Sequence, residues 1–141
     1  MRELSLAAAG HKLFTVMTVD MEAGLARRAF SDHPVEYPVS GTKPIHHDAW
    51  FEIVHGQRRS FVANTIGDIA AVFPDHERIA SLGCGSVLNL PVVLKGDLAA
   101  TINMLDAEHH YTPQRVTDAQ AQLAIPARLC CALALQFDSI R

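Results

Sequence analysis

The residues of this chain whose types could support chemistry include three cysteines. Cys84 lies between two glycines in L-G-C-G-S, where nearby backbone N–H groups could lower the pKa of its thiol. That setting makes a redox-active cysteine one hypothesis. The sequence favours a small buried structural cysteine, because Cys130 and Cys131 lie far along the chain and provide no evident resolving partner. An odd number of cysteines is no disulfide framework and fits a reducing cytoplasm.

Two histidine clusters, His46-His47-Asp48 and His109-His110, could suggest a metal site. Adjacent residues on a helix point about 100° apart, and zinc sites favour wider spacings. We therefore expect exposed histidines and no metal. No Ser-His-Asp order, phosphate-binding loop or paired-carboxylate motif stands out. This favours binding over catalysis, although scattered catalytic residues remain an alternative.

Polar residues interrupt the apolar segment 85–106, G-S-V-L-N-L-P-V-V-L-K-G-D-L-A-A-T-I-N-M-L-D. The segment predicts two long strands joined by a tight turn at Lys95-Gly96-Asp97. Buried polar side chains need partners, so either one sheet face is wet or it lines a pocket whose ligand supplies them. We expect Asn89, Thr101 and Asn103 to face a pocket, and Asn103→Leu to weaken ligand binding without destabilising the empty protein.

The other elements follow from hydrophobic spacing and capping residues. Residues 2–12 predict a short helix, Leu13–Asp20 and Leu25–Ser31 an antiparallel hairpin, and residues 32–44 a proline-rich loop. The predicted elements after it are a helix at 45–56, a strand at 60–64, helices that start after Thr65 and Asp75, the long hairpin, and a final helix from Thr112-Pro113. This order implies an α+β domain around an antiparallel sheet.

Length and charge limit the class further. A chain of 141 residues fits one domain, 1–141, and contains no apolar run long enough to cross a bilayer. Glu3 and the absence of a cleavage site argue against a signal peptide. The net charge of −3, with acidic and basic residues interspersed, argues against a nucleic-acid partner. We expect a cytoplasmic protein with neither a membrane nor a nucleic acid as partner.

The element order and the motif G-S-V-L-N-L-P-V-V-L-K-G-D-L-A-A-T-I-N-M-L resemble the GAF domain family, from about Leu13 to about Val116. The resemblance implies a GAF-like (PAS/profilin-like) fold. Its terminal helices would cover one face of the sheet and take part in dimer contacts. Loops and short helices on the other face would enclose a small-molecule pocket. Members bind ligands as different as cyclic nucleotides, tetrapyrroles, amino acids and oxo-acids, so the fold names neither ligand nor cofactor.

The resemblance and the polar hairpin positions together give a set of candidate ligand-binding residues. They are Tyr37, Trp50, Asn64, Asp68, Cys84, Asn89, Thr101 and Asn103. Each has an ordinary alternative: core packing for Trp50, helix capping for Asp68 and for Asp75, and solvent exposure for the strand residues.

These observations predict a sensory or regulatory module that binds a small molecule and signals through a homodimer or a separate partner. The dimer would form through the terminal helices, since Leu129, Leu133 and Phe137 add an apolar stripe to the last helix. One alternative is a small redox enzyme that uses Cys84, as free methionine-(R)-sulfoxide reductases of this fold use their cysteines. Another is a purely structural dimerisation module.

Overall fold

The computed structural model describes residues 1–39 and 41–140, and for 135–140 it describes the backbone alone. Within this part, six strands form one sheet in the order β3-β2-β1-β6-β5-β4, with every neighbouring pair antiparallel. The strands are β1 (Leu13–Asp20), β2 (Leu25–Ser31), β3 (Thr42–Pro44), β4 (Phe61–Ala63), β5 (Ser86–Leu94) and β6 (Asp97–Asp106). The predicted α+β class with a central antiparallel sheet is confirmed.

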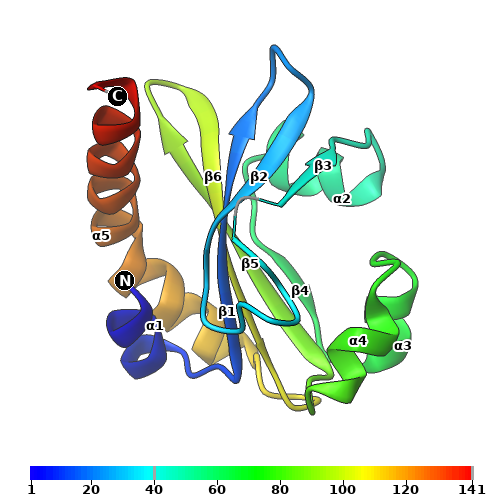
Figure 1. The fold of residues 1–141 in the computed structure, drawn as a ribbon. Coiled ribbons are helices and arrows are strands. Elements are labelled where there is room, and N and C mark those ends of the chain that lie inside the picture. Colours follow the sequence, from blue (N-terminus) through cyan, green and yellow to red (C-terminus); the bar gives the residue numbers. More distant parts are fainter. Residues whose placement is uncertain (40, 141) are drawn as a thin grey trace.

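Helices cover both faces of this sheet. They are α1 (Arg2–Ala8), α2 (Ala49–Phe51) with its π-helical continuation η1 (Glu52–Gly56), α3 (Ile66–Ala70), α4 (His76–Ser81) and α5 (Pro113–Ile140). Figure 1 shows α1 and α5 together on one side of the sheet, and α2, α3 and α4 on the other side. None of the helices in the described part has the length and apolar character needed to cross a membrane.

Strand alternation divides the buried side chains between two layers. The layer between the sheet and α5 contains Phe14 of β1, alternate residues of β5 and β6, and the inner face of α5. The opposite layer, under α3 and α4, contains the intervening strand residues Leu13, Val87 and Leu105. Thr15, Asn89, Thr101 and Asn103 are buried at strand positions that share the face of this second layer.

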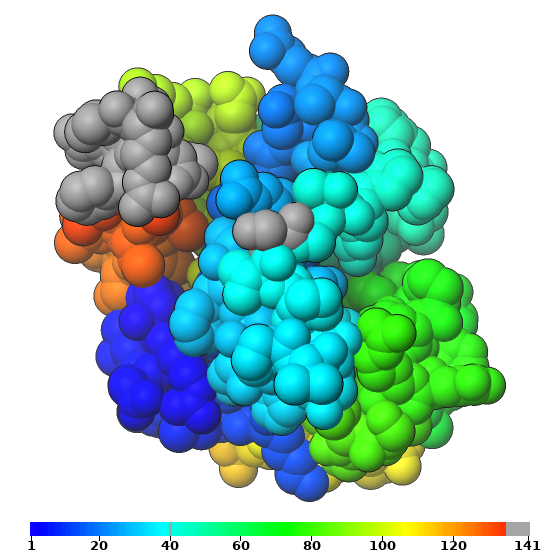
Figure 2. All heavy atoms as spheres, viewed as in Figure 1, coloured from blue at the N-terminus to red at the C-terminus, as the bar shows by residue number. Residues whose placement is uncertain are grey.

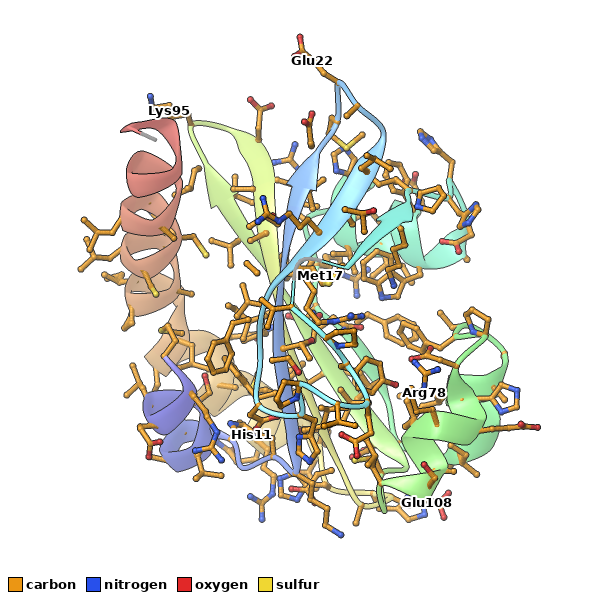
Figure 3. The ribbon with its side chains drawn as sticks, viewed as in Figure 1. His11, Met17, Glu22, Arg78, Lys95 and Glu108 are labelled. Carbon is orange, nitrogen blue, oxygen red and sulfur yellow. The ribbon has the colours of Figure 1, made fainter. Side chains whose placement is uncertain are left out.

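The long hairpin forms as the sequence predicts. Both central residues of its turn have positive φ, 54° at Lys95 and 82° at Gly96, which matches the right-handed twist of the flanking strands. Figure 3 shows Lys95 and Glu22 at the tips of the two hairpins, at the end of the sheet away from Glu108.

Two predicted boundaries between residues 32 and 56 are wrong. The end of the expected loop 32–44 forms the short edge strand β3, where proline is tolerated because few ladder bonds are needed. The helix expected from residue 45 begins at Ala49. Asp48 caps it by accepting the Phe51 N–H at 2.9 Å. Residues 32–39 cross the front of the molecule in Figure 2 and bring Tyr37 against the second layer.

Candidate functional site

A cavity of about 350 Å³ opens on the sheet face opposite α5, and we call it the sheet cavity. Its floor comes from β1, β2, β5 and β6, and its walls come from the 32–44 segment, α2–η1 and residues 72–75. The volume is in the range of small-molecule sites. Mostly apolar side chains with a few polar groups line it, namely Leu13, Thr15, Met17, Arg28, Tyr37, Trp50, Phe51, Phe73, Asp75, Val87, Asn89, Thr101, Asn103 and Leu105, among others.

Strand register brings the polar floor residues together. Asn89 of β5 lies opposite Asn103 of β6, which in turn lies opposite Thr15 of β1. The next row on the same face places Thr101 opposite Met17. Figure 3 shows Met17 near the middle of the sheet. Since directly opposed strand residues share a face, these positions form one polar patch across three strands.

A chain of side-chain hydrogen bonds runs through the first row. Trp50 Nε1–H donates to Asn89 Oδ1 at 3.0 Å, and Asn89 Nδ2 donates to Asn103 Oδ1 at 2.7 Å. Asn103 Nδ2 then donates to Thr15 Oγ at 3.2 Å. The two amides therefore have protein partners even without a ligand. The expectation that Asn103→Leu leaves the empty protein's stability unchanged is revised, because that change would break this chain.

Thr101 differs from its polar neighbours. It is only 3% exposed, and its hydroxyl makes no hydrogen bond to any residue that the structure describes. Thr101 lines the sheet cavity, so a ligand bound there would give its hydroxyl a hydrogen-bond partner.

One wall of the sheet cavity is built around Tyr37. Its hydroxyl donates to Asp75 Oδ2 at 2.6 Å, while the guanidinium carbons of Arg28 and Arg78 lie 5.1 and 5.6 Å from its ring centroid. Burial and the nearby Asp75 carboxylate raise the pKa of Tyr37, so it stays a neutral donor. Helix α4 begins directly after Asp75, as predicted, but the Asp75 carboxylate binds Tyr37 and makes no capping bond.

Trp50 and the turn that follows it form a second wall. Trp50 is half-buried and lines the sheet cavity, so its role combines packing with a hydrogen bond to the floor. The rings of His47, Phe51 and His55 stack in sequence, with centroids 4.2 and 4.5 Å apart. Helix α2 places Phe51 in the lining, and the π-helical turn η1, a type of turn frequent at functional sites, places His55 there.

Three of the predicted binding residues are not among those that line the sheet cavity. Asp68 is exposed on α3, and Thr65 caps that helix by accepting the Asp68 N–H. Cys84 is 4% exposed within the second apolar layer. Asn64 binds the chain near the start of α5: its side chain donates to Tyr111 O at 2.9 Å and accepts from Tyr111 N at 3.0 Å.

We expect Asn64→Ala to lower the free energy of unfolding by about 1–3 kcal/mol, because it leaves the Tyr111 N–H and C=O without partners. Urea unfolding measures the change, with exposed Asp68→Asn as the control, expected within about 0.5 kcal/mol of wild type. An Asn64→Ala protein as stable as the control would contradict this structural role.

Burial changes the expected chemistry of Cys84. It raises the pKa of the thiol to about 11, opposite to the lowered pKa that the redox hypothesis needs, and Cys84 is buried as the favoured interpretation expects. Relative to the ordinary value of 9.0, this leaves on the order of 100-fold less thiolate at neutral pH. Burial also raises the pKa of Cys131 to about 11, whereas Cys130 is exposed.

Alkylation of the native protein with iodoacetamide is therefore expected to modify Cys130 first. Cys84 and Cys131 should react only after denaturation, because their thiols are buried and protonated. Peptide mass mapping over time gives the order. Modification of Cys84 as fast as Cys130 would contradict the buried-thiol description.

In the described part of the chain, no three His, Cys, Asp or Glu side chains gather closely enough to hold a metal ion.

The structure adds Thr15 and Arg28 to the residues expected at the site. Arg27 and Arg28 are neighbours on β2, so their side chains must point to opposite faces and one must face inward. That pattern was a usable signal. The sequence gave no such signal for Thr15, because threonine is a usual β-branched residue in a strand such as β1.

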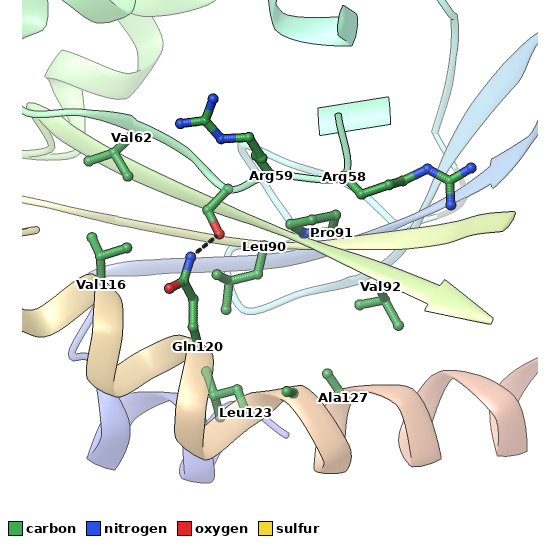
Figure 4. Close-up of a pocket in the computed structure, with 12 residues that line it drawn as sticks. Arg58, Arg59, Val62, Leu90, Pro91, Val92, Val116, Gln120, Leu123 and Ala127 are labelled. Atoms are coloured by element: carbon green, nitrogen blue, oxygen red, sulfur yellow. Dashed lines mark hydrogen bonds between the residues drawn. The ribbon is translucent and has the colours of Figure 1, made fainter. Parts of the chain in front are cut away.

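A second cavity, the helix groove, lies between β4–β5 and α5. Its volume is about 500 Å³, and Figure 4 shows Leu90, Val92, Leu123 and Ala127 within it and Arg58 and Arg59 above. A hydrogen bond from Gln120 Nε2 to Ser60 Oγ (2.8 Å) spans it. The groove contains no buried polar chain comparable with that of the sheet cavity, so we take the sheet cavity as the candidate site.

Several solved structures with the same architecture are GAF domains. That of a two-component sensor histidine kinase from Bacillus halodurans has a TM-score of 0.71 and 12% identity, covering 97% of this chain and 94% of that one. The GAF domain of a phosphoenolpyruvate-protein phosphotransferase (ptsP) from Coxiella burnetii has a TM-score of 0.64 and 14% identity, and the match covers 93% of this chain and 79% of that one. The PixJ GAF domain from Thermosynechococcus elongatus, in its blue-light absorbing form, has a TM-score of 0.64 and 13% identity, and the match covers 96% of this chain and 83% of that one.

The chain therefore has the GAF fold, as the hairpin motif predicts. No protein-family model matches the sequence, and no curated protein does. At these identities the likeness extends to the fold, and the site must be argued from its own side chains.

Proposed function

We propose that this chain is a sensory or regulatory module that binds one small molecule in the sheet cavity. The observation that carries the proposal is the hydrogen-bonded chain Trp50–Asn89–Asn103–Thr15 on the cavity floor. Two orienting amides and the Thr101 hydroxyl, which makes no hydrogen bond to a described residue, lie among mostly apolar walls. This is the usual composition of a small-molecule site. GAF domains of this architecture occur in a sensor histidine kinase and a phosphotransferase, which supports a signalling role.

The proposed ligand contacts are five of the predicted residues, Tyr37, Trp50, Asn89, Thr101 and Asn103. Tyr37 and Trp50 belong to wall segments, whereas the other three belong to the sheet. A ligand that contacts both would connect the rigid floor to α2–η1 and to the 32–44 segment. Occupancy would then change the order of those segments, which is a route for a signal to leave the site.

Native mass spectrometry of freshly purified protein tests the binding proposal. We expect a retained small molecule, or a mass shift on addition of a cell extract, and loss of that shift in Asn103→Leu. The exposed variant Asp68→Asn should keep the shift. A wild-type protein that binds nothing under both conditions would favour the structural dimerisation module instead.

Output through a homodimer is the second part of the proposal. On α5, Ile125, Leu129 and Leu133 are 73%, 61% and 49% exposed and follow one another at four-residue spacing. They form a stripe beside the buried residues Leu123, Ala127 and Cys131, which face the sheet. An exposed apolar stripe favours a second copy of the helix as partner. The side chain of Phe137, part of the predicted stripe, lies outside the described residues.

Sedimentation velocity at micromolar concentration tests this stripe. We expect a dimer for wild type, a monomer for Leu129→Glu and a dimer for Arg128→Glu, an exposed control on the same helix that points about 100° away from Leu129. A wild-type monomer, or a dimer unaffected by Leu129→Glu, would contradict the proposed interface.

A redox enzyme that uses Cys84 is the competing function. The buried thiol with its raised pKa argues against it. If the wild-type protein reduces free methionine sulfoxide with thiol turnover and Cys84→Ser does not, that function replaces the one proposed here.

A further inference from the structure

Arg28 is a half-buried cation in the lining of the sheet cavity. Its Nη1 donates to Pro38 O at 3.0 Å, but its Nε is buried and makes no hydrogen bond to any described residue. Burial lowers the pKa of Arg28, which expresses the cost of a charge withdrawn from water. Buried arginines are ordinarily paired with a carboxylate or satisfied by several acceptors.

The two acidic side chains in the lining of the sheet cavity already have partners among the described residues. Asp75 accepts the Tyr37 hydroxyl, and Asp48 accepts the Phe51 N–H at the start of α2. Arg78 adds a second guanidinium, 5.6 Å from the centroid of the Tyr37 ring. The group formed by Arg28, Asp75 and Arg78 therefore has one positive charge in excess, and no salt bridge joins Arg28 to an acid within the described residues.

We propose that the sheet cavity selects a small carboxylate with an apolar body, and that the carboxylate pairs with Arg28. This inference rests on the proposed function. Pro38 O uses Nη1, whereas Nε and Nη2 make no hydrogen bond to a described residue. Nε is covered in this structure, so a turn of the side chain would present the Nε–Nη2 edge for the parallel pair of hydrogen bonds that arginine makes to a carboxylate. Turning this edge to the ligand also satisfies the orphaned Nε.

The position of Arg28 in the sheet fits such a ligand. Arg28 of β2 lies opposite Met17 of β1, and Met17 in turn lies opposite Thr101 of β6. Two strand spacings, about 10 Å, therefore separate the backbone positions of Arg28 and Thr101. A cavity of about 350 Å³ holds on the order of ten to fifteen non-hydrogen atoms at binding-site density, which is enough to span that distance.

A single arginine in mostly apolar walls suits a planar monoanion better than a phosphate. Phosphate sites generally combine several backbone N–H groups or cations, and the lining contains, besides Arg28, only Lys43 as a permanently charged cation among the described residues. Lys43 is exposed on the edge strand β3, so it serves as a matched control for charge alone.

The test uses three carboxylates, 3-phenylpropionate, octanoate and 4-methylpentanoate, each against its neutral primary amide. Trp50 is the single tryptophan of the chain and lines the sheet cavity, so its fluorescence reports occupancy. We expect at least one carboxylate to bind at about 1 mM or tighter, with its amide about 10- to 100-fold weaker. Arg28→Met should abolish this preference, and Lys43→Met should keep most of it.

The ratio of carboxylate to amide affinity is insensitive to a partial loss of folded protein, which matters because Arg28 also binds Pro38 O. Arg28→Lys, which keeps the charge without the fork, is expected to retain only part of the preference. Equal binding of acid and amide, or an undiminished preference in Arg28→Met, would overturn the inference, as would binding of no carboxylate. Retention of a neutral or cationic molecule would overturn it while leaving the proposed function intact. Failure of every probe together with an empty native mass would remove both.

Discussion

Replacing Asn103 with leucine is expected to lower the free energy of unfolding by about 1–3 kcal/mol and to weaken ligand binding about 10- to 100-fold. The stability loss arises because Asn89 Nδ2 loses its acceptor and Thr15 Oγ loses its donor, both in a buried row. The binding loss arises because the floor loses a polar group at the centre of the sheet cavity. Urea unfolding and Trp50 fluorescence measure the two effects separately.

Thr101→Val is the matched control for Asn103→Leu. Its hydroxyl has no partner among the described residues, so we expect little loss of stability, or a slight gain, together with weaker binding. The double variant Asn89→Leu, Asn103→Leu should lose less than the sum of the single changes, because the two amides share one hydrogen bond. Full additivity, or an Asn103→Leu protein as stable as wild type, would show that the chain of amides does not form in solution.

Tyr111→Ala is expected to have the largest effect on stability, about 3–5 kcal/mol, because it empties a fully buried aromatic site. Tyr111 packs in the layer between the sheet and α5, and its hydroxyl donates to Gly10 O at 2.9 Å. Loss on this scale is a large part of the stability of an ordinary domain. Thermal and urea unfolding measure it.

Tyr111→Phe separates the ring from the hydroxyl. We expect it to cost about 1 kcal/mol, the contribution of one hydrogen bond, because the ring still fills the site. Similar losses for the alanine and phenylalanine variants would contradict the view that packing of the ring dominates.

Local patterns predicted the strands well. Leu13–Asp20 and Leu25–Ser31 have the predicted bounds, because alternation and a short connection define a hairpin without help from distant residues. Edge strand β3 was missed, because three residues ending in proline show no strand pattern, and only pairing with β2 defines them.

The candidate site was predictable in part for a related reason. Polar residues at alternate strand positions revealed the floor, since a strand pattern fixes which side chains share a face. It does not fix which loop covers that face or which residue a side chain will bind. Asn64 and Cys84 were therefore assigned to the pocket, although one binds the Tyr111 backbone and the other belongs to an apolar layer.

Arg28 shows the same limit from the other side. Two consecutive arginines on a strand require one to face inward, but the sequence does not show which of them, or that the nearby acids are already hydrogen-bonded. Only the strand register, which pairs Arg28 with Met17 and Met17 with Thr101, places Arg28 where one ligand could contact both Arg28 and Thr101.

A crystal structure of the protein with its retained ligand, or with the tightest of the carboxylate probes, tests the central claim most directly. We predict that the molecule lies in the sheet cavity, in contact with the Asn89–Asn103 row and with Trp50. A molecule seated instead in the helix groove beside Gln120, with the sheet cavity closed by protein side chains, would contradict it.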